Sequence, residues 1–250
     1  WRQAYPGVVT TGTPVLAQPR DMTELRRFAR LAPGHEEIDA TRIDGLEPDL
    51  AGRFHTGLFY AQEAHMRTPA ALAALLAGAR AAGAQVLLGT PWVKSDGADF
   101  TIDCRGLAAR AELPALRGVR GERLLVRSRD VALKRAVRLL HPRFPLYIVP
   151  WGDGLHLIGA TVLESEDMSP VTVRSALELL GMAYALSPGF GEAEIVEMSA
   201  GVRPAFPDNV PRVAVRGRTI HVNGAHRHGF LLGPALARIV AEIVAKGRCE

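Results

Sequence analysis

Apolar residues recur along the chain in two patterns, at helical spacing and in short runs bounded by turn residues. Together these patterns predict a mixture of helices and strands. The clearest helix is predicted over 68–82, where Thr68 caps the helix, Pro69 takes its first position and Gly83 ends an alanine- and leucine-rich run. Further helices are predicted over 21–31, with Asp21 as the N-cap, over 171–186 and over 234–246.

Short apolar runs between glycine, proline and polar residues predict the strands. We expect them over 8–18, 54–61, 85–88, 100–103, 121–126, 146–150, 155–161, 195–198 and 219–222. Trp151-Gly-Asp-Gly154 predicts a β-hairpin, and Ser95-Asp-Gly97 predicts a turn. We therefore expect a mixed fold of the α/β class (α+β mixed). The hairpin and 121–126 should share an antiparallel sheet, and the helix 68–82 should lie in another layer.

The composition is that of an ordinary globular protein, because hydrophobic residues make up 48% of the chain and charged residues 22%. The longest apolar runs are too short to span a bilayer or are broken by charge, and no signal-peptide pattern opens the chain. Cys104 and Cys249 have no metal-binding or redox spacing. We therefore expect a cytoplasmic protein with no membrane partner. Because Trp1 is not a natural start, we also expect the chain to begin within a longer protein.

Basic residues are densest over 117–138, in a chain with a net charge of +4. A nucleic-acid groove is one interpretation of such a run, but the run lacks the interleaved aromatic residues that stack on bases. Runs of charge more often form a solvated face. We therefore expect no nucleic-acid partner.

Two arginines lie beside glycine in segments that read as turns: Arg203 in Ala200-Gly-Val-Arg-Pro-Ala-Phe-Pro-Asp-Asn209, and Arg227 in Gly224-Ala-His-Arg-His-Gly-Phe-Leu-Leu-Gly-Pro-Ala235. The planar guanidinium suits a carboxylate, because two parallel N–H donors meet two oxygens. With the segment Pro145-Leu-Tyr147-Ile-Val-Pro-Trp-Gly-Asp-Gly154 and Ile158-Gly-Ala-Thr161, these stretches resemble the C-terminal part of the flavin-dependent D-amino-acid oxidase family. Within that family they are most similar to the glycine oxidase of thiazole, hence thiamine, biosynthesis.

The resemblance implies FAD as the cofactor and the oxidative deamination of glycine or another small amino acid, with O₂ reduced to H₂O₂. It also implies four chain segments: 1–60 as the first part of a substrate domain, 61–118 as part of an FAD-binding domain, 119–199 as the antiparallel sheet of the substrate domain, and 200–250 as the return to the FAD-binding domain. The oligomeric state is left open, homo-oligomer included.

By the same resemblance, Arg203 holds the substrate carboxylate and Tyr147 donates its phenol to it, which makes these two the predicted catalytic pair. Arg227 carries a second charge beside the substrate and the flavin. The alternatives are a surface arginine in a loop for Arg203 and a half-buried hairpin aromatic for Tyr147.

The resemblance also implies a set of cofactor contacts. The backbone of Ala225, His226, Arg227, His228, Gly229, Phe230 and Leu231 would run along the flavin, Trp92 would meet the adenine, and Cys104 and Gly106 would end a strand beside the cofactor. A glycine at 229 allows close approach because it has no Cβ. His226 and His228 have no carboxylate companion, so we expect no metal site. Cys104 has no histidine at a recognisable spacing, so we expect no nucleophilic role for it.

The Gly-x-Gly-x-x-Gly turn that holds the FAD pyrophosphate in this family does not occur in the 250 residues. We expect it in sequence outside this chain, because half a sheet would otherwise expose apolar strand edges. A second polypeptide that carries the motif and a degenerate remnant are the alternatives. A sarcosine- or proline-type amine dehydrogenase and a non-catalytic, flavin-less binding module or subunit remain as alternative functions.

Overall fold

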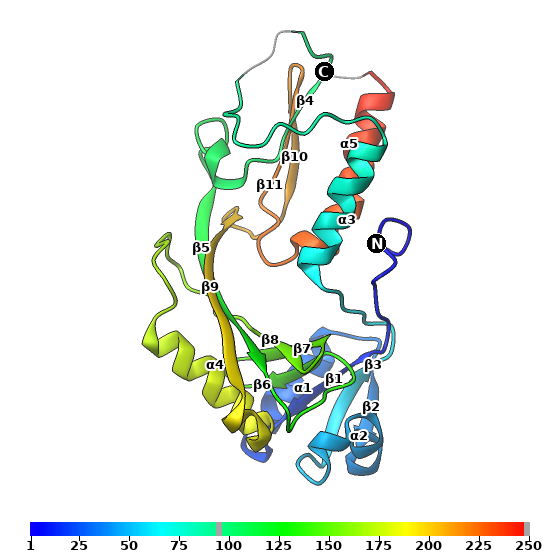
Figure 1. Cartoon of the computed structure of the whole chain (residues 1–250), viewed down its shortest axis with the longest axis vertical. Coiled ribbons are helices and arrows are strands. Elements are labelled where there is room, and N and C mark those ends of the chain that lie inside the picture. Colours follow the sequence, from blue (N-terminus) through cyan, green and yellow to red (C-terminus); the bar gives the residue numbers. More distant parts are fainter. Residues whose placement is uncertain (94–96, 248–250) are drawn as a thin grey trace.

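The computed structural model describes residues 1–93 and 97–247. Within these residues, eight strands form a large sheet and three strands form a small one (Figure 1). The strands are β1 (Thr13–Ala17), β2 (Glu36–Asp39), β3 (Thr56–Tyr60), β4 (Thr101–Asp103), β5 (Arg117–Arg127), β6 (Val137–Leu140), β7 (Leu146–Gly152), β8 (Leu155–Gly159), β9 (Glu194–Ala205), β10 (Arg212–Arg216) and β11 (Thr219–Asn223). The α-helices are α1 (Met22–Leu31), α2 (Ala40–Leu46), α3 (Thr68–Ala81), α4 (Val173–Leu186) and α5 (Gly229–Ala245).

The large sheet has the strand order β2-β3-β1-β6-β7-β8-β5-β9. β1 pairs parallel with β6, and each of the other neighbours in this order pairs antiparallel. β5 and β9 are the longest strands and pair along almost their whole length, with Gly121 opposite Gly201 and Val119 opposite Arg203. The predicted hairpin is therefore present as β7 and β8, in the same sheet as β5, as expected.

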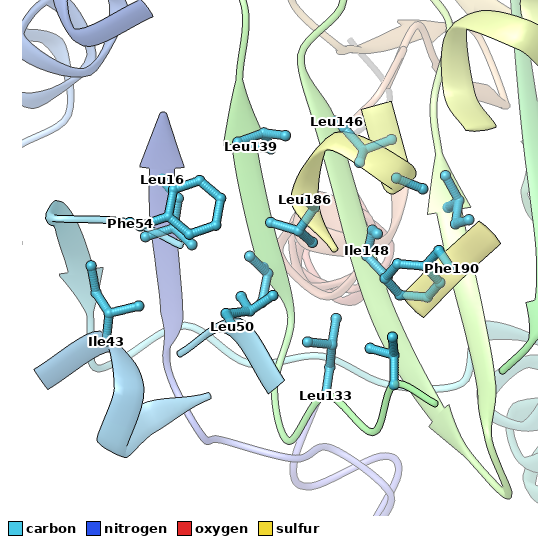
Figure 2. Packing of buried hydrophobic residues seen from close by; sticks show 14 of the residues in the cluster. Leu16, Ile43, Leu50, Phe54, Leu133, Leu139, Leu146, Ile148, Leu186 and Phe190 are labelled. Carbon is cyan, nitrogen blue, oxygen red and sulfur yellow. The ribbon is translucent and has the colours of Figure 1, made fainter. Parts of the chain in front are cut away.

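The two faces of the large sheet are covered by different helices. On one face, α4 and α2 bury the main hydrophobic core, which includes Leu16, Leu139 and Ile148 from the strands and Leu186 from α4 (Figure 2). On the other face, α1 packs over the β1 end of the sheet through a smaller cluster around Leu25. Side chains alternate between the two faces along a strand. Every second residue of β6, β7 and β9 therefore points to the same face of the sheet as α1, in the part of that face that α1 does not cover.

The small sheet has the order β10-β11-β4, and it lies with α3 and α5 at the opposite end of the molecule from α1 and α2 (Figure 1). Both helices of this end leave apolar side chains exposed, among them Leu72 on α3 and Leu231 on α5. Within the part of the chain that the structure describes, these apolar faces have little to pack against.

The sequence located most elements, and the differences have physical reasons. The run 85–88 was wrongly predicted as a strand: Leu87 and Leu88 are 72% and 76% exposed, because no strand of the described chain lies beside them. Thr68 is the first residue of α3 and not its cap, which is Arg67. α5 begins at Gly229, five residues before the predicted start, and contains Pro234. Asp21 is the N-cap of α1 but makes no side-chain capping bond.

Among the strands and α-helices, four were not predicted: β2, β6, β10 and α2. Ser95 and Asp96 of the predicted turn, and Cys249, lie outside the described residues. The predicted mixed fold of the α/β class is confirmed. Within the described residues, no helix has the length and hydropathy needed to cross a membrane.

Candidate active site

A cavity of about 630 Å³ opens on the α1 face of the large sheet. Tyr147, Arg203, Arg227 and His228 all line it, although they come from β7, β9 and the turn before α5. The opposite wall is supplied by α1, including Phe28. The structure therefore brings together the residues that the sequence predicted to bind the substrate.

Arg203 lies on β9, and not in a turn as its glycine and proline neighbours suggested. The strand continues through Pro204 because β9 is an outer strand of the sheet, where a missing N–H is tolerated. Its guanidinium lies flat over Gly121 of β5: a Cβ built on this glycine would be 1.9 Å from both terminal nitrogens. Nη1 of Arg203 also donates to the carbonyl oxygen of Thr161 at 3.4 Å.

Tyr147 lies on β7, directly opposite Gly159 of β8 and Arg138 of β6. Its ring rests on Gly159, where a Cβ would be 2.6 Å from the phenolic oxygen. Two glycines therefore form the floor under the two predicted substrate-binding side chains. The phenol has no hydrogen-bond partner in the described residues, so it is available to a ligand.

The cavity is positively charged. Burial lowers the pKa of the Arg203 guanidinium; the nearby Tyr147 opposes this effect and the charge of Arg227 adds to it. A guanidinium nevertheless stays charged at neutral pH. Arg138 also lines the cavity and lies 3.4 Å from Glu63. The burial cost of Arg203 falls when an anion binds, which favours a carboxylate ligand.

The turn before α5 is anchored to β9. Ala225 forms a bridge with Ala205, and the backbone N–H of His226 donates to the carbonyl oxygen of Pro204 at 3.1 Å. His226 has a positive φ of 47°, and its Nε2 is buried with no hydrogen-bond partner among the described residues. Burial, followed by the charges of Arg203 and Arg227, lowers the pKa of His226, which favours the neutral imidazole.

Trp92, Cys104 and Gly106 lie elsewhere, around the small sheet, and they do not line this cavity. Arg105 stacks 4.4 Å over the Trp92 ring and forms a bidentate pair with the buried Asp103 at the end of β4. Hydrogen bonds from Arg105 hold the pKa of Asp103 down at about 2. Gly106 has a φ of 61°, in the left-handed region that favours glycine. Cofactor roles for Trp92, Cys104 and Gly106 remain predictions.

A buried ion pair behind the cavity was missed by the sequence reasoning. Arg120 and Glu122 flank Gly121 on β5, point to the face covered by α4, and are 2% and 0% exposed. They lie 2.8 Å apart, and Glu122 also accepts from the hydroxyl of Thr161 at 3.0 Å. The pair thus fixes β5 to the segment whose carbonyl holds Arg203. The signal was the Arg-Gly-Glu alternation, which places two opposite charges on one face of a strand.

The basic run 117–138 is not a free cationic face. Seven of its arginines lie within 4 Å of a carboxylate oxygen: Arg117, Arg120, Arg123, Arg127, Arg129, Arg135 and Arg138. No group of three or more potential metal ligands gathers anywhere in residues 1–93 and 97–247. The cavity is therefore the feature of these residues that best fits a small anionic ligand.

Residues 2–243 match the family described as FAD dependent oxidoreductase. The chain belongs to this family. A Rhizobium etli protein assigned to thiamine biosynthesis as the oxidoreductase ThiO is 53% identical over 242 residues, which cover 96% of this chain and 74% of that protein. The glycine oxidase of Bacillus licheniformis is 25% identical over 84% of this chain and 62% of its own length.

The crystal structure of glycine oxidase from Geobacillus kaustophilus has the same fold, with a TM-score of 0.82 at 24% identity over 98% of this chain and 74% of that one. The expected family is therefore confirmed. The protein is an enzyme, a flavin-dependent oxidoreductase of the ThiO and glycine oxidase kind, and not a non-catalytic binding module.

FAD is the cofactor of this family, and the turn before α5 fits part of it. A Cβ on Gly229 would project into open space, with only the Ala225 Cβ within 4 Å at 3.9 Å, so a ring can approach the backbone closely. α5 starts at this glycine without a side-chain cap, which leaves N–H groups of its first turn free to donate to a bound oxygen. The open space over Gly229 and the uncapped start of α5 thus fit the ring end of the cofactor.

Proposed function

We propose that this protein oxidises glycine, or another small amino acid, to the imino acid with reduction of O₂ to H₂O₂. The observation that carries the proposal is the shared cavity of Arg203 and Tyr147, with Arg227 and His228 in its wall. An arginine and a phenol that face one space, next to a turn that fits a flavin ring, suit a substrate with one carboxylate.

Arg203 and Tyr147 orient the substrate. The guanidinium of Arg203 supplies two parallel N–H donors, and the phenol of Tyr147 adds a third donor to the same carboxylate. Both side chains rest on glycine floors in neighbouring strands, so the carboxylate is held by rigid elements. Such positioning removes rotational freedom before the reaction and thereby lowers the barrier.

The positive charges of the cavity also act on the substrate amine. Arg203 and Arg227 both line the cavity, and their charges disfavour an ammonium ion nearby. This lowers the pKa of the bound amine and favours the neutral form, whose lone pair assists loss of hydride from the α-carbon. When bound, FAD supplies the hydride acceptor and passes the two electrons to O₂. Phe28 on α1 adds an apolar wall that helps to exclude water.

The test is anaerobic reduction of the FAD-loaded protein, followed by its visible absorbance, with glycine, sarcosine and D-alanine. We expect glycine to bleach the flavin and, in air, to release one H₂O₂ for each imino acid. Reduction without peroxide would replace the oxidase by the amine dehydrogenase of the sarcosine or proline type. No bleaching by any of the three compounds would refute the proposal.

A further inference from the structure

A second cavity of about 300 Å³ lies beside the candidate active site. It is enclosed by the β6–β7 connection, the segment after β8, and α4. Four residues line both cavities: Pro145, Leu146, Ala160 and Arg227. Thr161, whose carbonyl oxygen accepts from Arg203, lines the second cavity as well. The second cavity therefore shares a wall with the cavity of the predicted carboxylate clamp, and Ala160 lies in that wall.

The inner wall of the second cavity is apolar. Leu146 and Leu179 belong to the main core, and Met182 of α4 packs against it. Met182 is unbranched and adapts its shape to what lies beside it. The hydroxyl of Thr161 is not free to bind a ligand, because it donates to Glu122 at 3.0 Å and accepts from the backbone N–H of Glu122 at 2.9 Å.

Three charged residues also line this cavity, and none of them is buried. Arg143 is exposed and its guanidinium lies 5.4 Å from the centre of the Phe144 ring. Arg227 is also exposed and belongs to the wall shared with the larger cavity. Glu178 is half-buried on α4, one residue before the core residue Leu179. The buried or half-buried part of the lining includes the apolar set of Leu146, Leu179 and Met182, in contrast to the cationic cavity next to it.

We propose that the second cavity is a subsite for an apolar substituent of the substrate, carried on its nitrogen or its α-carbon. This inference rests on the proposed function, because the carboxylate of the same molecule is held by Arg203. A branched aliphatic group that reaches across Ala160 would leave water for the apolar wall of Leu146, Leu179 and Met182. Glycine leaves this space unused, so amino acids with a branched apolar group are better substrates than glycine.

The test compares kcat/KM of the FAD-loaded protein for glycine, N-isobutylglycine, D-leucine and L-leucine. We expect at least one branched compound to exceed glycine by about tenfold, the discrimination that a few methylenes give in an apolar pocket. The N-substituted and α-substituted arms identify the point of attachment. Met182→Trp fills the cavity from α4, and Val162→Trp fills it from the exposed rim and tests the same idea if the first variant fails to fold.

Both filling variants should lower the ratio of kcat/KM for the branched compound to that for glycine by about tenfold. Leu177→Trp is the matched control, because Leu177 is an exposed residue of α4 that does not line the cavity. A readout that does not need oxidation is calorimetric binding of 4-methylpentanoate relative to acetate, which should fall in the same variants.

Failure of the subsite and failure of the proposed function give different results. If glycine is oxidised but no branched compound is better, or the filling variants leave the ratio unchanged, the subsite is refuted and the oxidase stands. If no amino acid reduces the flavin, the proposed function and the subsite both fall.

Discussion

Gly121 lies directly beneath the guanidinium of Arg203, so that a Cβ on this glycine would be 1.9 Å from Nη1. The contact joins β5 to β9 on the face that lines the cavity. Any other residue at position 121 would displace the guanidinium. Because the displaced atoms are the far end of a flexible side chain, the cost falls on the position of the charge and not on the fold.

The first prediction is that Gly121→Ala weakens carboxylate binding while it leaves the fold intact. The new methyl group moves the guanidinium of Arg203 and breaks its alignment with a carboxylate. We expect Kd for acetate and KM for the amino acid to rise about tenfold or more, as for loss of one charge-assisted hydrogen bond of about 1.5–3 kcal/mol. Calorimetry and steady-state kinetics measure these two values, and the thermal midpoint should stay close to that of the wild type.

Gly201→Ala is the matched control. Gly201 pairs with Gly121 in the β5–β9 register, but a Cβ built on it meets nothing within 4 Å. This variant should bind acetate as the wild type does. Equal effects of the two substitutions would show that the loss of a glycine in these strands, and not the contact with Arg203, is responsible.

The sequence was sufficient for the parts of the site that are local. The Trp151-Gly-Asp-Gly154 turn places β7 and β8, and therefore Tyr147, in an antiparallel hairpin. The strand containing Arg203 was predicted to end before it, because glycine and proline disfavour strands on local grounds. Its pairing with β5 over the full length outweighs that preference, and such pairing between distant segments cannot be read from a single window.

The missed elements and contacts have the same cause. β6 and β2 are only four residues long, so their alternation is too short to be recognised, and β6 pairs with the distant β1 as well as with the neighbouring β7. The contacts of Gly121 with Arg203 and of Gly159 with Tyr147 were also missed, because they depend on which side chain of the neighbouring strand lies over each glycine. Conversely, 85–88 has the apolar composition of a strand, yet no described strand pairs with it. An apolar composition shows that a segment can be buried in a sheet, but a neighbouring strand is needed for it to be buried there.

The second prediction concerns the buried pair behind the cavity. Glu122→Gln keeps the shape of the side chain but leaves the buried Arg120 without a counter-charge, which typically costs about 3–5 kcal/mol of unfolding free energy. Urea denaturation measures this loss. Glu197→Gln, which removes a half-exposed partner of Arg123, should leave the midpoint close to the wild-type value.

The same pair predicts acid sensitivity. Burial opposes ionisation of Glu122, but hydrogen bonds from Ser175, Arg120 and Thr161 outweigh it and lower its pKa in the folded state. Because the pKa of Glu122 is lower in the folded than in the unfolded state, its ionisation stabilises the fold at pH values above the unfolded pKa. This contribution is lost as the pH falls through the folded pKa. The Glu122→Gln variant should therefore lose less stability on acidification than the wild type. An identical pH dependence in both would contradict the ionised state of Glu122.

The third prediction has the opposite sign of pH dependence. Burial raises the pKa of Glu47 to about 6, despite a hydrogen bond from the backbone of Lys134 and the charge of Arg135. Ionisation of this carboxyl therefore costs stability, and about 2 kcal/mol is lost in total as the pH rises from below 4.5 to above 6. Denaturation of Glu47→Gln at pH 4.5 and pH 7, with the exposed Glu37→Gln as control, should show that this component is gone. A difference equal to that of the wild type would mean that Glu47 is ionised without cost.

The last prediction separates the charge of Arg203 from its shape. Arg203→Lys keeps a positive group over Gly121 but loses the two parallel donors, so a carboxylate can swing and the α-carbon leaves its position. We expect substrate affinity to fall by about one to two powers of ten, from the loss of one charge-assisted hydrogen bond of about 1.5–3 kcal/mol. The rate of flavin reduction should fall as well, because the misplaced carboxylate also misaligns the reacting carbon. Stopped-flow reduction followed by visible absorbance gives both values.

Arg27→Lys, at the exposed rim of the same cavity on α1, controls for a change from guanidinium to ammonium and should leave both the affinity and the rate close to wild type. Because the turn before α5 would contact the flavin through its backbone, the FAD content of both variants should be unchanged. If Arg203→Lys also keeps wild-type affinity and rate, the carboxylate is held by another group of the cavity.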